Sequence, residues 1–215
     1  MHIPKLSRRK ILLAGAGGLA AAALPTTARA AGVVEPDIDS TQTWQARPPR
    51  TPVSLVTTRP TKIIVHHTVS ANTSDFSRAQ SHAHAHWVQD LHMDQNGWLD
   101  GGYHFITSRG GWLTEGRHRS LSTLQGGSSF VLGAHTSGQN EQAIGIANEG
   151  SYHDGAQPPQ AQWEVLVTLC AYVCQQYGIA PSHIYGHKDF GDTLCPGVLH
   201  DSLPRLRSEV AASMG

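Results

Sequence analysis

The sequence predicts an α/β protein, a single domain in which a mixed central β-sheet is flanked by about three α-helices. Two apolar runs, at 63–65 and 143–148, have the uninterrupted hydrophobicity of strands that are buried on both faces. Apolar residues recur at helical spacing between 74 and 92 and again between 158 and 178. Strands that alternate with helices are typical of a sheet covered by helices.

The first 30 residues have the pattern of an export signal. Ser7-Arg8-Arg9-Lys10 precedes a small-residue apolar run, and Ala28-Arg29-Ala30 offers a cleavage site. The run, from 11 to 24, is shorter than the roughly 20 residues that span a bilayer. Paired arginines indicate the twin-arginine pathway, and an ordinary secretory signal is the alternative. Both interpretations predict a secreted mature protein.

Residues 31–61 are rich in proline and show little periodicity, so we expect an extended lead-in that wraps over the surface. The main domain is predicted at 62–215. It begins with the strand at 62–65, which ends in His66-His67-Thr68. Ser74-Asp75 then offers an N-cap for a helix that runs to about His92.

The rest of the chain continues the alternation of strands and helices. A strand at 103–106, a turn at 109–111 and a second strand at 112–113 are followed by the apolar strand at 143–148. The clearest helix follows Pro158-Pro159 and ends at Gly178. A short strand at 181–185 and a final helix at 198–212 complete the domain.

Composition limits the classes of function. After the signal about 185 residues remain, enough for one domain with a sizeable core. Lys plus Arg and Asp plus Glu both number 16, so charge does not favour nucleic acid or an anionic membrane as a partner. Cys170 and Cys174 lie one helical turn apart, either buried as small apolar side chains or joined in an awkward disulfide.

The segment 186–197 contains several glycines and carries His187 and Cys195, which are eight positions apart. Together with the histidines at the end of the 62–65 strand, it indicates a zinc site. Two neutral imidazoles and one thiolate would leave a fourth position for water, which is the arrangement of a catalytic zinc. Hydrolysis is therefore the first hypothesis.

Four blocks of sequence, in order, carry a resemblance to a known family: Ile64-Val65-His66-His67-Thr68, Gly97-Trp98-Leu99-Asp100-Gly101-Gly102-Tyr103-His104-Phe105, Ile144-Gly145-Ile146-Ala147-Asn148-Glu149-Gly150, and Gly186-His187-Lys188-Asp189 through Cys195-Pro196-Gly197. From about Lys62 to Arg207 the chain resembles the zinc-dependent N-acetylmuramoyl-L-alanine amidases, a family that includes phage amidases and peptidoglycan recognition proteins. Four blocks in the family's order identify the family far more specifically than any single block does.

The resemblance implies an activity and a ligand set. Its zinc ligands fall on His66, His187 and Cys195, which would hold one Zn²⁺ ion. The implied reaction is hydrolysis, by zinc-activated water, of the amide between the lactyl group of N-acetylmuramic acid and L-alanine. The implied partners are peptidoglycan and muropeptides, and we expect a monomer without stable membrane insertion.

The resemblance also implies catalytic residues. Tyr103 matches the family's active-site tyrosine, whose phenol can hydrogen-bond the attacking water or the oxyanion. Thr193 stands where phage relatives carry a lysine, so its hydroxyl would give weaker help to the oxyanion. Some distant amidases carry a catalytic glutamate where this chain has Ala147, so that role does not carry over to Glu149. Glu149 shares a strand face with Ala147, so it either faces the cleft as a base or substrate contact or caps the strand end in solvent.

Four further residues are candidate substrate contacts. His67 does not match a ligand position, so it either orients the strand end or contacts substrate, and we also assign His104 to substrate binding. His135 and Asn140 lie where relatives line the substrate groove, although a loop histidine is often simply solvated. By contrast, of the alternating histidines at 82, 84 and 86 only His82 and His86 share a helix face, so a solvated face is predicted, with adventitious metal binding as the alternative.

Two other functions remain open at this stage. Some relatives bind muropeptide without catalysis after losing a zinc ligand, and the complete set of three ligands argues against that alternative here. A zinc amidohydrolase that acts on another acylated peptide is the second alternative.

Overall fold

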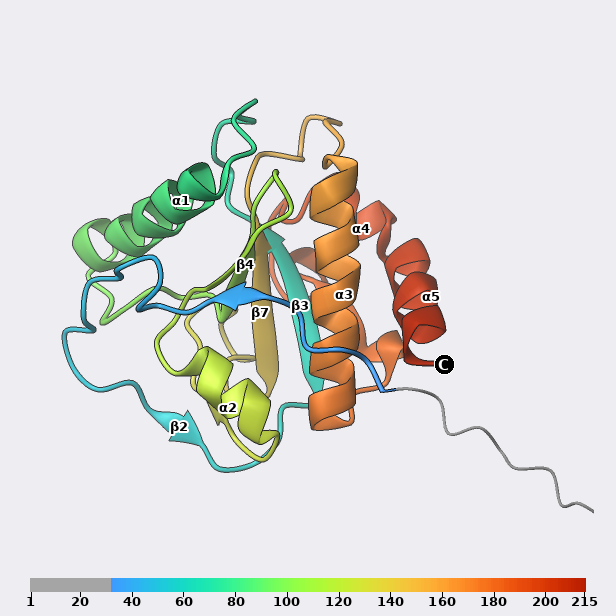
Figure 1. Cartoon of the computed structure of the whole chain (residues 1–215), viewed down its shortest axis with the longest axis horizontal. Coiled ribbons are helices and arrows are strands. Elements are labelled where there is room, and N and C mark those ends of the chain that lie inside the picture. Colours follow the sequence, from blue (N-terminus) through green and yellow to red (C-terminus); the bar gives the residue numbers. More distant parts are fainter. Residues whose placement is uncertain (1–31) are drawn as a thin grey trace, which may run out of the picture.

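The computed structural model describes residues 32–215, so the export signal expected at 1–30 lies outside it. Figure 1 shows the arrangement of its elements. The strands are β1 (Ile38–Asp39), β2 (Leu55–Val56), β3 (Lys62–His67), β4 (Phe105–Thr107), β5 (Leu113–Glu115), β6 (Phe130–Val131), β7 (Ala143–Asn148) and β8 (Ile184–Gly186). The helices are α1 (Arg78–Asp90), α2 (Ser120–Gly126), α3 (Gln160–Tyr177), α4 (Val198–Asp201) and α5 (Leu203–Met214).

The main sheet is mixed, with the strand order β1-β5-β4-β7-β3-β8. β4 and β5 pair antiparallel, whereas β3 pairs parallel with both β7 and β8. The predicted fold class, a single α/β domain around a mixed central sheet, is confirmed. Since β3, β7 and β8 run in the same direction, their carboxyl ends meet at one edge of the sheet, where ligand sites of parallel sheets usually lie.

Helices cover both faces of the sheet (Figure 1). On one face, β3 and β7 contribute Ile63, Val65 and Ile144 to the main core, together with the buried side of α3. On the other face, Ala85 and Val88 of α1 pack in a smaller cluster with Ile106 and Trp44. Alternating residues of β3 therefore face different layers, and His66 follows Ile64 onto the face that α1 covers.

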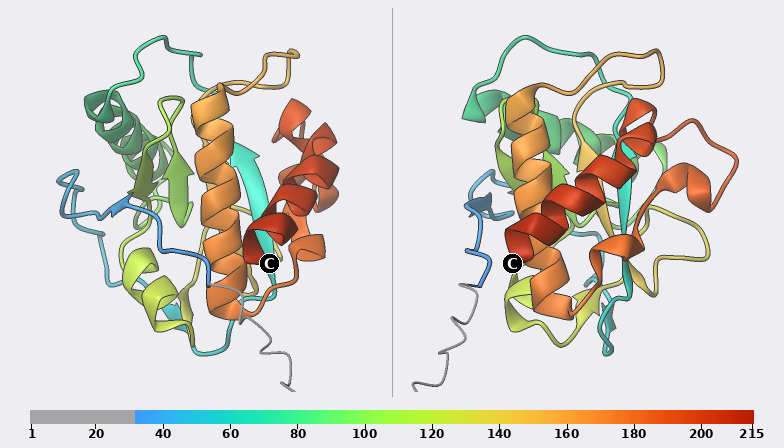
Figure 2. Two further views of the ribbon diagram at one scale, coloured as in Figure 1. Left: turned by 45° about the vertical axis from the view of Figure 1, so that its right-hand side comes forward. Right: turned by 90° about the vertical axis from the view of Figure 1, so that its right-hand side faces the viewer.

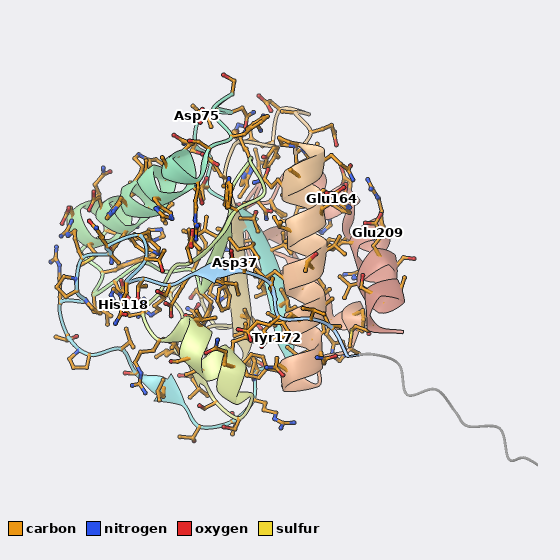
Figure 3. All side chains as sticks on the ribbon, in the orientation of Figure 1. Asp37, Asp75, His118, Glu164, Tyr172 and Glu209 are labelled. Carbon is orange, nitrogen blue, oxygen red and sulfur yellow. The ribbon has the colours of Figure 1, made fainter. Side chains whose placement is uncertain are left out.

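α3 forms as its apolar spacing predicts and ends at Gly178, whose positive φ of 74° suits a glycine. α5 packs across α3, as both panels of Figure 2 show. Glu209 of α5, labelled in Figure 3, accepts a hydrogen bond of 2.6 Å from Trp163 Nε1 of α3. Cys170 and Cys174 are buried and free, so of the two alternatives the buried thiols are observed.

The lead-in does not only wrap over the surface; it is also part of the main sheet and of the buried core. Ile38 and Asp39 form β1, which pairs parallel with β5 at the edge of the sheet. Trp44 is 2% exposed, and its Nε1 donates to the carbonyl of Glu115 at 2.8 Å. A two-residue strand and a single tryptophan carry no periodicity, so the sequence pattern could not indicate them.

Some boundaries differ from the expected ones. α1 begins after Ser77, whose side chain accepts from the Gln80 amide, because Asp75 instead accepts from the Ser77 amide in a turn before the helix. The final helix is divided into α4 and α5 at Ser202. The short helix α2 and the antiparallel pair β2–β6, whose strands are far apart in the sequence, were not expected. Among residues 32–215 no helix combines the length and the hydrophobicity needed to cross a membrane.

Candidate metal centre and active site

The first two histidines of the site lie at the carboxyl ends of two parallel strands. Val65 of β3 is in register with Gly186 of β8, so His66 and His187 follow at the same edge of the sheet. Their ring centroids lie 4.6 Å apart. His66 is fully buried, whereas His187 is half-buried, so the pair opens toward solvent on the His187 side.

The loop after β8 brings Cys195 back to the same place. The Lys188 amide donates to the Cys195 carbonyl at 2.9 Å, which closes the loop. The Thr193 hydroxyl accepts from the Cys195 amide at 3.2 Å, and the Cys195 sulfur accepts from the His67 amide at 3.4 Å. Cys195 Sγ thereby comes to 3.7 Å from His66 Nδ1.

The three side chains fit a zinc ion. One ligand atom from each of His66, His187 and Cys195 lies within 4.8 Å of the others. Zn–S bonds of about 2.3 Å and Zn–N bonds of about 2.0 Å at a tetrahedral angle separate sulfur and nitrogen by about 3.5 Å. The observed 3.7 Å between Cys195 Sγ and His66 Nδ1 agrees with that separation.

Burial sets the protonation of these groups before any cation binds. It lowers the pKa of His66 well below its usual value and also lowers the pKa of His187, so both imidazoles are neutral ligands at pH 7. It raises the pKa of Cys195 to about 12, so binding of a cation must displace the thiol proton.

His135 fixes the orientation of the His66 ring. His135 Nε2 lies 3.4 Å from the Ala143 carbonyl, which can only accept, so this nitrogen carries the proton. His135 Nδ1 is then an acceptor, and it lies 3.0 Å from the Thr136 hydroxyl and 3.1 Å from His66 Nε2, both of which can donate to it. This network, from which the tautomers are assigned, leaves the lone pair of His66 Nδ1 facing Cys195.

Two glycines make room for the ring of His135. A Cβ on Gly145 would lie 2.5 Å from the His135 ring, and a Cβ on Gly133 would lie 2.7 Å from it. Both distances are below any that a real Cβ makes, so an alanine at either position would displace the ring. The sequence block that contains Gly145 therefore shapes the metal centre, although Gly145 itself carries no functional group.

Tyr103 lies beside the cluster, with its ring centroid 5.1 Å from that of His66. Burial raises the pKa of its phenol, so the hydroxyl remains a hydrogen-bond donor across the neutral range. The ring of Tyr103 also lies 5.3 Å from that of His92, which sequence reasoning did not identify. His92 Nδ1 accepts from the Gly102 amide at 2.9 Å and so positions the segment that carries Tyr103.

A shallow groove leads away from His187 and is lined by Trp98, His135, Asn140 and Ser137, with a volume of about 380 Å³. Asn140 Oδ1 accepts from the backbone amides of His135 and Thr136, at 2.9 and 3.0 Å, and shapes the groove wall. His135 and Asn140 thus lie at the groove as expected, but the His135 nitrogens are directed at His66 and the backbone.

His67 and His104 are both enclosed by the fold. His67 is 2% exposed, and its Nδ1 accepts from the Tyr152 amide at 3.0 Å on the side of the sheet opposite His66. His104 is fully buried, and its two ring nitrogens pair with the Val131 carbonyl and the Gly145 amide at 2.7 and 2.9 Å. Neither ring therefore reaches the groove.

Glu149 is buried at 1% exposure, so it does not cap the strand end in solvent. Its two carboxylate oxygens accept from Gln80 Nε2 at 2.8 Å and from the Arg109 amide at 2.9 Å.

The prediction that the alternating histidines of α1 are solvated is wrong in part, because His84 is only 5% exposed. His84 Nδ1 lies 3.8 Å from Glu149 Oε1, whereas His82, on another face of the helix, bonds Asp39 at 2.7 Å.

The fold and the His-His-Cys cluster define an α/β domain with a candidate metal centre at the carboxyl edge of its sheet. The family model described as N-acetylmuramoyl-L-alanine amidase matches residues 56–198. The chain therefore belongs to this amidase family, the type 2 family shared with peptidoglycan recognition proteins.

Individual relatives agree with that membership. The chain is 31% identical to peptidoglycan-recognition protein SC2 of Drosophila melanogaster over 135 residues, which cover 62% of this chain and 66% of that protein. The structure of the amidase LysC from Clostridium intestinale is similar, with 26% identity, a TM-score of 0.64 and coverage of 82% of this chain and 99% of that one. A mutant of Drosophila PGRP-LB, solved in complex with tracheal cytotoxin, has 26% identity and a TM-score of 0.64 over 74% of this chain and 88% of that one.

Proposed function

We propose that this protein is a zinc-dependent N-acetylmuramoyl-L-alanine amidase, which hydrolyses the amide between the lactyl group of N-acetylmuramic acid and the L-alanine of the stem peptide. The observation that carries the proposal is the cluster of His66, His187 and Cys195, whose ligand atoms lie within 4.8 Å of one another. A structural zinc site would use a fourth protein ligand. Among the described residues this cluster has three, and the half-buried His187 leaves its outer side accessible.

A bound zinc ion would act as a Lewis acid and would lower the pKa of a coordinated water toward neutrality. The remaining work falls to the chain itself. Tyr103 would donate its phenolic hydrogen to the oxygen that becomes negatively charged as the amide is attacked. The Thr193 hydroxyl lies two residues from Cys195 but accepts from the Cys195 amide, so we assign it to holding the ligand loop as well as to the oxyanion.

Two members of the family support the proposed substrate class. The Clostridium intestinale relative is named an amidase, and a PGRP-LB mutant was solved in complex with tracheal cytotoxin. We infer that this chain takes peptidoglycan or muropeptides, and that the groove beside His187 holds part of the substrate between Trp98 and Asn140. We further propose secretion through the twin-arginine pathway, directed by residues 1–30, and a monomeric enzyme.

Mass spectrometry of digested peptidoglycan tests the proposal. Purified sacculi treated with the zinc-loaded protein should yield stem peptides that begin with a free L-alanine, together with glycan that has lost its peptides. Cys195→Ser should abolish both products, whereas Cys174→Ser should retain them. If the zinc-loaded protein binds sacculi and releases nothing, the chain is a recognition module. Cleavage at another amide would make it a different amidohydrolase.

A further inference from the structure

A hydrogen-bonded pair of side chains joins the loop that carries two of the candidate zinc ligands to helix α4. The pair consists of Asp189, in the 3₁₀ turn His187–Asp189 that follows β8, and His200 of α4. His200 Nε2 lies 2.7 Å from Asp189 Oδ1. A carboxylate oxygen accepts, so His200 donates this hydrogen bond. Neither residue of this Asp189–His200 pair belongs to the candidate ligand set.

The second oxygen of Asp189 binds the backbone next to a ligand. Asp189 Oδ2 accepts from the Gly186 amide at 2.9 Å, and Gly186 directly precedes His187. One side chain therefore connects the end of β8 to α4. Because Gly186 is also in register with Val65 of β3, the hydrogen bond fixes where the chain leaves the sheet and turns toward the cluster.

The ring of His200 also packs against the same glycine. A Cβ on Gly186 would lie 2.8 Å from His200 Cδ2 and 2.9 Å from Pro196 Cδ, and both distances are shorter than real Cβ contacts. Gly186 thus lies between two rings with no room for a side chain. Since Pro196 directly follows Cys195, the neighbours of His187 and of Cys195 are in contact at this point.

Helix α4 is itself anchored to the body of the domain. Leu199, which precedes His200, is 1% exposed and belongs to the main core. The Val198 amide at the start of the helix donates to the Tyr152 carbonyl at 2.9 Å. His200 therefore has a fixed position from which it can hold Asp189, although α4 is a helix of only four residues.

Exposure separates positioning of the ligands from a contribution to stability. The side chains of His200 and Asp189 are 27% and 30% exposed. Even as an ion pair, partners as accessible as these contribute little to the free energy of unfolding. Loss of the pair should therefore leave the domain folded. Its consequence should appear at the backbone that Asp189 also binds, which places His187 relative to Cys195.

We propose that Asp189 and His200 are positioning residues for the candidate metal centre, which together fix the loop conformation in which His187 and Cys195 face the same ion. The inference rests on the proposed zinc site and adds two residues that are not themselves ligands. Contacts that orient the ligands of a metal typically change its affinity about 10–100-fold. The metal centre then depends on α4, an element that carries none of the three candidate ligands.

Metal binding tests this role without any turnover. The metal-free full chain is titrated with Zn²⁺ against a chromogenic chelator and, separately, with Co²⁺, whose absorption bands report the coordination geometry and the bond to the Cys195 thiolate. Asp189→Ala removes both hydrogen bonds, whereas His200→Phe keeps a ring against Gly186 and removes the donor. We expect each variant to weaken Zn²⁺ binding about tenfold or more and to alter the Co²⁺ spectrum.

Two further variants separate the geometry of the hydrogen bonds from charge. In Asp189→Asn the amide oxygen can still accept from Gly186, and the amide nitrogen can donate to His200 Nε2 once the imidazole proton moves to Nδ1. We expect this variant to bind Zn²⁺ within about threefold of the wild type. Asp192→Ala is the charge-matched control for Asp189→Ala, since Asp192 lies exposed on the same loop outside the pair, and it should leave Zn²⁺ affinity unchanged.

Unchanged Zn²⁺ affinity and an unchanged Co²⁺ spectrum in folded Asp189→Ala and His200→Phe proteins would overturn the positioning role, and so would an Asp189→Asn variant that binds as weakly as Asp189→Ala. Circular dichroism identifies a misfolded variant; if Asp189→Ala is misfolded, His200→Phe decides alone. A wild-type chain that binds no metal overturns the proposed function together with this inference. A chain whose zinc affinity depends on the pair but that releases no alanine from sacculi contradicts the amidase function alone.

Discussion

The chemistry of the candidate metal centre depends on which ring nitrogen of His66 carries the proton. The Ala143 carbonyl, His135 and His66 form a chain of contacts at 3.4 and 3.1 Å, and this chain places the free lone pair on the side of Cys195. Outer-shell partners of this kind orient a ligand and raise its basicity. His135 is therefore a positioning residue for His66.

His135→Ala should weaken zinc binding about 10–100-fold, because His66 would lose the acceptor that fixes its tautomer. The measurement is competition with a chromogenic chelator, together with the circular dichroism spectrum to establish that the fold is retained. His183→Ala replaces an exposed histidine that is not part of the cluster and should leave zinc affinity unchanged. Unaltered zinc affinity in a folded His135→Ala protein would contradict the positioning role.

Tyr103→Phe should lower kcat about 10²–10³-fold with little change in zinc affinity, because it removes a donor to the developing oxyanion and leaves the ligands in place. Steady-state release of alanine from a soluble muropeptide is the assay. Tyr185→Phe serves as the matched control on β8. A drop in zinc affinity that accounts for the whole loss of activity would instead assign Tyr103 to the metal centre.

At the scale of elements, β1 and α1 are joined by an ion cluster. Asp39 of β1 is 4% exposed and accepts from Arg78 Nε at 2.8 Å and from His82 Nε2 at 2.7 Å. The Arg78 hydrogen bond, the largest cause, holds the pKa of Asp39 below its usual value of 3.8. A depressed carboxyl pKa stabilises the fold above the usual value and stops doing so as pH falls through the folded value.

Asp39→Asn should therefore lower the free energy of unfolding by about 1 kcal/mol at pH 7, a modest value because Arg78 is 45% exposed. The difference from the wild type should shrink as pH falls below about 4, because the unfolded chain's carboxyl gains a proton first, and it should vanish once pH falls through the lower folded pKa. Urea unfolding at pH 7 and at pH 3 measures both effects. A difference that grows on acidification would show that the Asp39 carboxylate does not stabilise the fold.

The elements also show what the sequence could and could not predict. β3, β7 and α3 were predictable because each carries a continuous or periodic apolar pattern in a single segment. The two-residue strand β1 and the position of His84 depend on partners far away in sequence. The candidate site divides in the same way. Its three candidate ligands could be predicted from local sequence motifs. The contact of His92 with Tyr103 and the orientation of His135 toward His66 could not, because these rings come together only after folding.

At the scale of the whole molecule, the parallel strands β3 and β8 place two ligands at one edge of the sheet, and the loop after β8 adds the third. The groove that His187 lines opens beside these ligands.

Zinc titration of the metal-free protein tests the central claim most directly. Activity on purified peptidoglycan should be absent after chelation and should return in proportion to added zinc, reaching its maximum at one ion per chain. Cys195→Ser should neither retain the ion nor recover activity, whereas Cys170→Ser, which replaces a buried free thiol outside the cluster, should do both. Full activity without zinc, or a chain that holds one zinc ion and cleaves no amide, would contradict the account.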